Sequence, residues 1–357
     1  MPFRDCTGCP VLLADEGRLL GVQSGSDLRM NRSHAAALAF ALVSLPVGAQ
    51  DFDLQGHRGA RGLAPENTLA GFTRALAVGV STLELDCGVT KDGVVVVSHD
   101  RVLNPDHTRD AAGNFLAVPG PAIVDLTYAE LGAYDVGRIR PGSELAAAFP
   151  EQVPADGERI PRLADVFALV ERSGNRTVRF NIETKIDPAR PEQTVSPLAF
   201  ARALEAAIRE SGMASRVTVQ SFDWRTLRLL GALAPDIALV ALTDQQEGED
   251  TIEAGKPGPS PWLGELDVDD HGGSVPKLVQ ALGAKTWSPH ALDLTPALVI
   301  EAHSLGLAVV PWTVNDPADM ERAVALGIDG LITDYPDRLR TVLQSKGIAV
   351  PAPTPMQ

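Results

Sequence analysis

Residues 82–100 read TLELDCGVTKDGVVVVSHD, and the way in which this stretch must turn determines the fold class. It holds two runs of β-forming residues, 82–89 and 94–99, joined only by Thr90-Lys91-Asp92-Gly93. A crossover between parallel strands needs about a dozen residues or more, so the two runs must form an antiparallel hairpin that turns at Asp92-Gly93. Only one of them can therefore belong to a set of parallel strands.

Elsewhere, from residue 53 onward, short β-rich runs alternate with helical patterns. The other predicted strands are 53–58, 178–185, 217–222, 237–242, 284–288, 308–314 and 330–333. Helical patterns lie between them, among others at 67–78, 163–171, 198–211, 224–233, 296–305 and 317–326. Alternation of this kind implies parallel strands joined by crossover helices.

Eight parallel strands remain once the return strand of the hairpin is set aside. This number predicts an α/β fold, a (β/α)₈ TIM barrel in which the hairpin extends the second strand. A doubly wound open sheet is the alternative architecture. It would normally carry a Gly-rich phosphate loop after the first strand, and this sequence has none there.

Two segments interrupt the alternation. Residues 100–160 contain Pro, Gly and charge with few periodic stretches, which predicts a small insertion after the hairpin. Residues 244–276 form an acidic loop after the strand at 237–242, and loops in that position lie on the face where barrels carry their active sites. We expect the barrel to span 50–346 and residues 347–357 to form a flexible tail.

The amino-terminal 49 residues are expected to be absent from the mature protein. Residues 30–49 combine a short basic start, an apolar run at 35–47 and small residues before Gln50, which is the pattern of a secretory signal peptide. The apolar run is shorter than a membrane-spanning helix needs to be. It also lacks the polar face that an amphipathic helix packed on a protein core would have. Residues 1–29 then form an over-called leader, and we expect a periplasmic or secreted protein.

The charge composition argues against some classes of binding partner. The chain has 357 residues, with 31 Lys and Arg against 46 Asp and Glu, and a formal net charge of −15. Such a charge argues against nucleic acid as a partner and against stable attachment to an anionic membrane. After the leader is removed, Cys87 is the one cysteine left, so no internal disulfide is expected. The sequence does not indicate an oligomeric state.

Charged side chains and histidines collect near the ends of the early predicted strands. The set comprises His57, Arg58, Glu84, Asp86, His99, Glu183 and Lys185. Residues i and i+2 of a strand point to one face, so Glu84 and Asp86 share a face, as do Glu183 and Lys185. Burying such charges together is unfavourable unless they are compensated.

A divalent cation would supply that compensation. The three carboxylates bring three negative charges, and one cation with Arg58 and Lys185 brings four positive charges. The remaining positive charge suits a bound phosphodiester anion. Because all the predicted ligands are carboxylates, the sequence favours a hard ion, Mg²⁺ or Ca²⁺, over Zn²⁺.

His57 and His99 are expected at the same rim as the carboxylates. Imidazole changes its protonation near neutral pH and can act as a general acid or base. Two such groups beside a metal-bound phosphate suit an in-line displacement, in which one accepts the proton of the nucleophile and the other protonates the leaving alkoxide. The alternative is a network of salt bridges in which Arg58 and Lys185 hold the carboxylates and the histidines bond to the backbone.

Nine short motifs also follow one another in order along the chain. They are His57-Arg58-Gly59, Pro65-Glu66-Asn67-Thr68, Glu84-Leu85-Asp86, Thr90-Lys91-Asp92-Gly93, His99-Asp100, Ile182-Glu183-Thr184-Lys185, Gln220-Ser221-Phe222, Trp312-Thr313-Val314-Asn315 and Thr333-Asp334-Tyr335-Pro336. This ordered set resembles the glycerophosphodiester phosphodiesterase family, and a secreted or periplasmic member in particular. The resemblance covers about residues 53–343, nearly the whole mature chain.

The resemblance implies a TIM barrel that hydrolyses glycerophosphodiesters to an alcohol and sn-glycerol 3-phosphate. For catalysis it implies one Ca²⁺ or Mg²⁺ ion on Glu84, Asp86 and Glu183, with His57 and His99 as the acid–base pair. For substrate binding it implies Arg58 and Lys185 on the phosphate, Trp312 against the glycerol and Glu66 in support of the site.

Two other functions stay in competition at this point. A phospholipase D-like enzyme acting on intact lipids would need an exposed apolar or basic docking surface, which the net charge of −15 argues against. A non-catalytic binding protein would be expected to have lost the acid–base pair, which this chain retains. The acidic residues of 244–276 are expected to favour a cationic head group without taking part in the chemistry.

Overall fold

The structure is a computed structural model that describes residues 52–355, so the expected leader at 1–29 and signal peptide at 30–49 lie outside the described residues. The strands are β1 (Asp53–Gly56), β2 (Thr82–Val89), β3 (Val95–Val97), β4 (Arg179–Thr184), β5 (Val217–Ser221), β6 (Ala238–Thr243), β7 (Thr286–Pro289), β8 (Ala308–Val309) and β9 (Gly330–Thr333). The α-helices are α1 (Leu69–Val78), α2 (Tyr128–Leu131), α3 (Glu144–Ala148), α4 (Leu163–Ser173), α5 (Pro197–Ser211), α6 (Trp224–Leu233), α7 (Val275–Leu282), α8 (Pro296–Ser304), α9 (Pro317–Ala325) and α10 (Pro336–Ser345).

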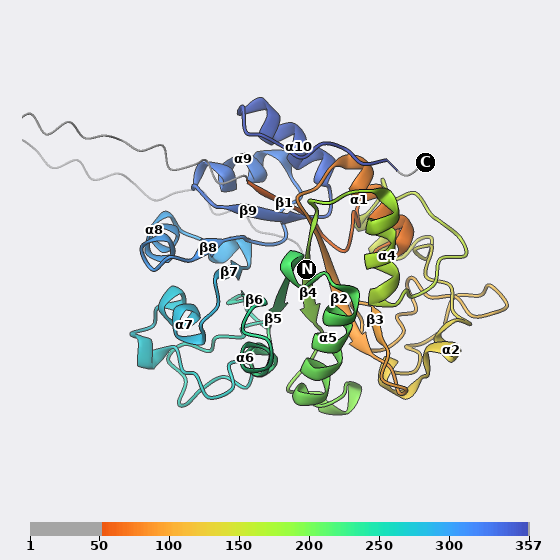
Figure 1. Cartoon of the computed structure of the whole chain (residues 1–357), viewed down its shortest axis with the longest axis horizontal. Helices are drawn as coiled ribbons and strands as arrows, with labels where there is room; N and C mark the ends of the chain where they lie inside the picture. Colours follow the sequence, from red (N-terminus) through yellow and green to blue (C-terminus); the bar gives the residue numbers. More distant parts are fainter. Residues whose placement is uncertain (1–51, 356–357) are drawn as a thin grey trace, which may run out of the picture. The chain divides into compact units, whose positions relative to one another are not determined.

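The strands form one sheet in the order β8-β7-β6-β5-β4-β2-β1-β9, and every neighbouring pair along this path is parallel. Strand β3 lies off this path and pairs with β2 in the antiparallel sense, as the four-residue connection requires. Helices lie around the outside of these strands (Figure 1). The predicted (β/α)₈ barrel with a hairpin on its second strand is thus confirmed.

The barrel closes through an irregular junction between β8 and β9. Three backbone hydrogen bonds join the two segments, for example from Asp329 N to Val309 O at 2.9 Å and from Ile332 N to Pro311 O at 3.0 Å. Pro311 has no N–H to donate, which interrupts the ladder here. For this reason the predicted strand at 308–314 appears as the two-residue β8, although Val310 N and Trp312 N still donate to the β7 side.

Helix α1 shows how local sequence sets the limits of an element. The Thr68 hydroxyl accepts a hydrogen bond from Gly71 N at 3.0 Å and so caps the first turn. Gly79 ends the helix with φ 88°, in the left-handed region that glycine enters without strain. The loop at 57–67 carries several of the predicted site residues, and it leads from β1 into this capped first turn of α1.

Alternation along β2 divides its side chains between two environments. Leu83, Leu85 and Cys87 belong to the main hydrophobic core. Glu84 points instead to the barrel interior, where Gln220 Nε2 donates to it at 2.7 Å. Asn181 donates to Gln220 and to Gln55, so amide groups fill the layer below.

The insertion at 100–160 packs around a small apolar cluster of its own. Leu103, Ile123, Leu131, Val136 and Ile160 form this cluster with Val96 of the hairpin. Its regular elements are short, with the capping box of Thr127 and Glu130 starting the four-residue α2. The insertion therefore continues from β3 and adds a wall beside the end of the hairpin.

The carboxyl-terminal segment is held more firmly than the sequence led us to expect. We predicted a flexible tail at 347–357, but Ile348 and Val350 pack against the core and Thr354 N donates to Leu76 O at 2.8 Å. Arg340 also donates to Pro351 O at 2.6 Å. These contacts fasten residues 348–354 across helix α1.

Across residues 52–355, none of the helices combines the length and the apolar character that crossing a membrane would require.

The core packing of β2 yields a test of the fold. Replacing Leu85, which is fully buried, with Ala should lower the free energy of unfolding by about 3 kcal/mol, because the truncation leaves a cavity. Urea denaturation of the purified variant measures this loss. Leu292 is 78% exposed, so Leu292→Ala should change stability by less than about 0.5 kcal/mol. Equal effects of the two changes would contradict the inward packing of Leu85.

Candidate active site

Three predicted carboxylates meet at the carboxyl ends of β2 and β4. The strands are parallel neighbours in a register that sets Asp86 opposite Glu183. Glu84, Asp86 and Glu183 are all buried, and one oxygen of each lies within 4.8 Å of the other two. The sequence pattern thus brings the predicted metal ligands together.

Burial and mutual repulsion make this cluster electrostatically unfavourable by itself. Burial raises the pKa of Glu84 well above its ordinary value, and the charges of Asp86 and Glu183 raise it further. Burial likewise raises the pKa of Glu183 to about 7, against the opposing effect of Lys185. The cluster therefore favours either a bound proton or a cation.

Two predicted cations stand beside the cluster. Lys185 Nζ lies 2.8 Å from Glu183 and 3.7 Å from Asp86. Arg58 Nε lies 3.3 Å from Asp86. Although burial acts in the opposite direction, the positive charges of His99, Lys185 and Arg58 hold the pKa of Asp86 below its ordinary value. Both predicted phosphate-binding residues are thus at the carboxylate cluster.

Backbone geometry at the end of β1 fixes the position of Arg58. This residue has φ 50°, and its N–H donates to Glu84 Oε2 at 2.8 Å. Gly59 follows with φ 89°, and a Cβ there would lie 2.7 Å from the carbonyl carbon of Gly71. Only glycine fits this close approach to α1, which explains the glycine of the His57-Arg58-Gly59 motif.

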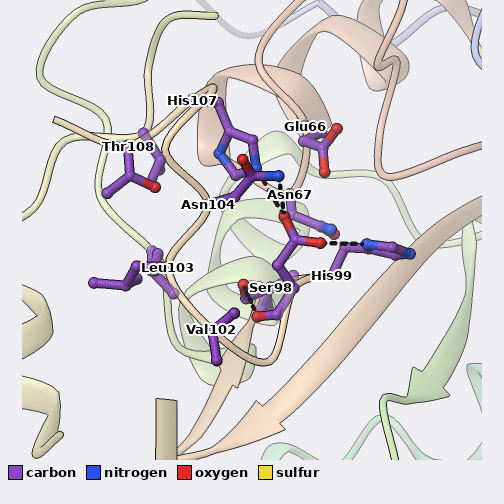
Figure 2. A pocket seen from close by; sticks show the side chains of 13 residues that line it. Glu66, Asn67, Ser98, His99, Val102, Leu103, Asn104, His107 and Thr108 are labelled. Atoms are coloured by element: carbon purple, nitrogen blue, oxygen red, sulfur yellow. Dashed lines mark hydrogen bonds and ion pairs between the residues drawn. The ribbon is translucent and has the colours of Figure 1, made fainter. Parts of the chain in front are cut away.

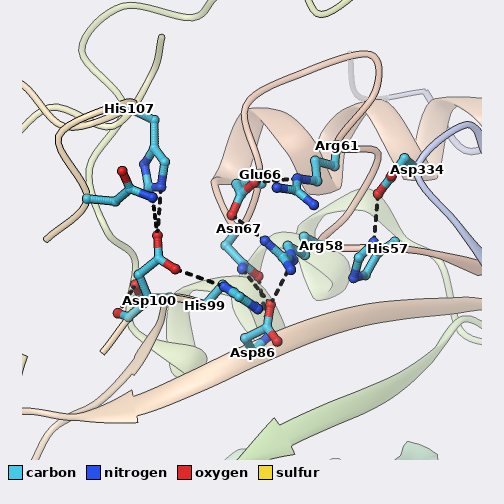
Figure 3. A network of polar contacts seen from close by, with 12 residues as sticks. His57, Arg58, Arg61, Glu66, Asn67, Asp86, His99, Asp100, His107 and Asp334 are labelled. Atoms are coloured by element: carbon cyan, nitrogen blue, oxygen red, sulfur yellow. Dashed lines mark hydrogen bonds and ion pairs between the residues drawn. The ribbon is translucent and has the colours of Figure 1, made fainter. Parts of the chain in front are cut away.

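Glu66 lies behind Arg58 rather than among the carboxylates. Its two oxygens lie 2.8 Å from Arg58 Nη1 and 2.5 Å from Arg61 Nε. Burial raises its pKa, but these two guanidinium groups outweigh that effect and hold it below the ordinary value. Figure 3 shows Glu66 beside both arginines. It therefore supports the position of Arg58.

His57 is oriented by a carboxylate from the far end of the chain. Its Nδ1 lies 2.6 Å from Asp334 Oδ1, and Asn315 donates to the other oxygen of Asp334 at 2.7 Å. Since an ionised carboxylate only accepts, Nδ1 carries the proton and Nε2 is free. That nitrogen lies 4.0 Å from Glu84. Burial lowers the pKa of His57.

His99 is likewise oriented by a carboxylate, that of Asp100. Its Nδ1 lies 3.0 Å from Asp100 Oδ1, and Asp100 Oδ2 accepts from Asn104 at 2.8 Å and His107 at 3.1 Å. Figure 2 shows this group, and Figure 3 shows His99 near Asp86. Burial lowers the pKa of His99 to about 4, with Arg58 and Lys185 adding to the effect.

A cavity of about 210 Å³ opens between the two histidines. One wall is polar and contains His57, Arg58, Glu84, His99, Glu183 and Lys185. The facing wall is apolar and contains Phe222, Leu242, Trp312 and Ile332. Phe222 and Trp312 meet edge to face at 5.3 Å between ring centroids, and Trp312 Nε1 donates to Ser288 O at 3.0 Å. These contacts fix the aromatic wall.

Several residues of the site were not given roles by sequence reasoning. Asp334, Asn315, Asn67 and Gln220 lie within quoted motifs, but nothing local revealed that Asp334 orients a histidine 277 positions away. His107 lies outside the quoted motifs, and it shares Asp100 with His99. Its partner lies seven residues away across an irregular loop, so no periodic pattern pointed to it.

The acidic loop at 244–276 reaches the site through an aromatic residue. None of its acidic side chains lines the cavity, whereas Trp262 meets Phe222 edge to face at 6.4 Å. A second acidic group, Asp244 and Asp293 with His290, lies beside the aromatic wall. Both of its carboxylates already accept backbone N–H groups from residues 245 and 246.

Comparison with known proteins gives consistent matches over nearly the whole described chain. The model of the glycerophosphoryl diester phosphodiesterase family matches residues 57–338. A glycerophosphodiester phosphodiesterase of Caldanaerobacter subterraneus subsp. tengcongensis is 31% identical over 295 residues, which cover 82% of this chain and 97% of that protein.

Solved structures agree with this assignment. A Silicibacter pomeroyi protein, provisionally assigned as a glycerophosphoryl diester phosphodiesterase, has a TM-score of 0.75 and 36% identity over 84% of this chain and 96% of its own. An Oleispira antarctica phosphodiesterase in complex with the product sn-glycerol-3-phosphate has a TM-score of 0.59 and 21% identity over 81% and 96%, a likeness of fold alone. Sequence and fold together show that the chain belongs to the glycerophosphoryl diester phosphodiesterase family.

Proposed function

We propose that this glycerophosphodiester phosphodiesterase uses one divalent cation and two histidines to release an alcohol and sn-glycerol 3-phosphate. The observation that carries the proposal is the environment of Glu84. Its carboxylate is buried, and within residues 52–355 no lysine or arginine side chain lies within 4 Å of it. A buried carboxylate without a cationic partner is costly, and a bound cation removes that cost.

The donor set fits such an ion. Glu84, Asp86 and Glu183 would hold it, with one oxygen from each side chain already within 4.8 Å of the others. An all-carboxylate set suits Ca²⁺ or Mg²⁺. When bound, the ion would polarise a phosphoryl oxygen and offset the charge that develops on it. A salt-bridge network alone leaves Glu84 uncompensated.

Arg58 and Lys185 are placed to bind the phosphate. Both line the cavity and both contact the carboxylate cluster, so they stand next to the position of a metal-bound anion. Asp86 contacts both side chains, and Glu66 holds Arg58 from behind. These contacts fix the positions of the two cationic groups. Trp312, on the facing wall, would pack against the carbon face of the glycerol.

The two histidines would move the protons. His57 presents Nε2 because Asp334 holds Nδ1, and His99 presents Nε2 because Asp100 holds its Nδ1. One ring accepts the proton of the attacking oxygen and the other protonates the leaving alkoxide. The lowered pKa of each histidine suits the ring that acts as the base, whereas the ring that acts as the acid must carry a proton on Nε2 when the alkoxide leaves.

Metal dependence is the first test. Excess chelator should abolish hydrolysis of glycerophosphoglycerol, and adding back Ca²⁺ or Mg²⁺ should restore it. Glu84→Gln should weaken metal binding at least tenfold in calorimetry, since a charged ligand is lost. It should also remove the rise in melting temperature that the metal produces in the wild type.

The control variant is Glu265→Gln, because Glu265 is exposed and pairs with Arg228 at 2.9 Å. It should bind metal and hydrolyse substrate like the wild type. Full activity in chelator, or unchanged metal affinity in Glu84→Gln, would contradict the ligand assignment and favour the salt-bridge alternative.

Loss of either histidine is the second test. His57→Asn and His99→Asn should each reduce kcat by about 10²- to 10⁴-fold, the usual contribution of general acid–base catalysis. Metal affinity measured by calorimetry should stay within a few fold of the wild type. His303→Asn is the matched control, because His303 is exposed on α8 and pairs with Asp329. A variant that keeps wild-type turnover is not part of the acid–base pair.

We also propose that residues 30–49 direct export to the periplasm or beyond, a proposal supported only by their composition. Mass spectrometry of the exported protein should find Gln50 at its amino terminus. Leu42→Arg, which breaks the apolar run, should keep the protein in the cytoplasm as precursor. An exported protein that retains residues 30–49 would contradict the proposal.

A further inference from the structure

A second cavity opens beside the catalytic one. It measures about 390 Å³ and shares the lining residues His99 and Lys185 with the catalytic cavity, so the two cavities adjoin there. Its other walls come from the insertion after β3 and from the loop after β4. The polar groups on these walls include Arg101, Asn104, Arg190 and Gln193.

The two arginines of this cavity differ in what they contact. Arg101 donates to Asp187 at 2.8 Å and to Gln193 at 3.1 Å, which ties the insertion to the loop after β4. Arg190 is exposed, and it forms no ion pair with any of the residues from 52 to 355. The side chain of Arg190 is therefore an uncompensated positive charge at the cavity wall.

The acid in this wall keeps its negative charge but is held by other partners and does not pair with Arg190. Asp100 is already engaged by His99, His107 and Asn104, and its pKa is held below the ordinary value by the histidine hydrogen bonds despite burial. Lys185 is paired with Glu183. The cavity thus offers a guanidinium and side-chain amides to whatever enters it.

A phosphodiester has an alcohol on each side of phosphorus, and this site has two unlike sides. Phe222 and Trp312 line the catalytic cavity, Asn104 and Arg190 line the second cavity, and His99 and Lys185 line both. In-line displacement sets the attacking oxygen opposite the leaving alcohol, while the glycerol ester stays on phosphorus. With glycerol against Trp312 in the catalytic cavity, the second cavity, which His99 also lines, can take the leaving alcohol.

We propose that this cavity is the head-group subsite and that Arg190 selects polyol or anionic head groups over cationic ones. The inference rests on the proposed function, since it requires glycerophosphodiesters as substrates. It reverses the preference that the acidic loop at 244–276 led us to expect. No acidic residue of that loop lines either cavity, whereas Arg190 lines the second.

The test compares kcat/KM for glycerophosphoglycerol and glycerophosphocholine, with metal added. The wild type should prefer glycerophosphoglycerol. Arg190→Glu should shift the ratio roughly fivefold toward glycerophosphocholine, because a repelling charge becomes an attracting one in a solvated site. Arg190→Gln should give a smaller shift in the same direction, and added salt should reduce both shifts.

Arg202→Gln is the matched control, because Arg202 is likewise exposed but lies on α5 away from both cavities. Its ratio should equal that of the wild type. A wild type that prefers glycerophosphocholine, or an Arg190→Glu ratio that does not move, would overturn the subsite. Absence of hydrolysis of either diester by the metal-loaded wild type would instead refute the proposed function, so the two failures are distinguishable.

Discussion

Burying three carboxylates within 4.8 Å of one another at the ends of β2 and β4 is the constraint that organises the rest of the site. Two parallel strands in this register cannot separate Asp86 from Glu183, because their backbone hydrogen bonds fix them as neighbours. The surrounding contacts reduce the repulsion among the three carboxylates. Lys185 and Arg58 contribute charge, while the Arg58 N–H and the Gln220 amide donate to Glu84.

The hydrogen bonds that hold Glu84 continue into the interior of the barrel. Gln55, Asn181 and Gln220 form a chain of amide hydrogen bonds below Glu84, where many barrels are filled by branched apolar side chains. An amide chain fixes the direction of each donor and acceptor, so Glu84 is held in one orientation. The interior therefore gives up some hydrophobic stabilisation and gains a rigid base for the carboxylates.

The fold was largely predictable because its signals are local. The short connection at 90–93 forces the hairpin, and alternation of strands and helices gives the barrel. The carboxylates and histidines were also predictable, because strand ends place them on one rim. What sequence reasoning missed depends on contacts between distant segments. Asp334 reaches His57 from the end of the neighbouring strand β9, Pro311 shortens β8, and the tail docks on α1 through Thr354.

The separate apolar cluster of the insertion at 100–160 has a consequence for how this barrel can diversify. The residues of this cluster pack on one another and on Val96, so they can change without repacking the helices of the barrel, whereas Phe149 of the same segment belongs to the main core. The same segment supplies Asn104 and Arg101 to the outer cavity, while the carboxylates belong to β2 and β4. Changes in this part of the insertion can therefore alter the wall of the outer cavity while the carboxylates stay on the barrel strands. A lineage that varies this wall must still keep Asp100, because Asp100 orients His99.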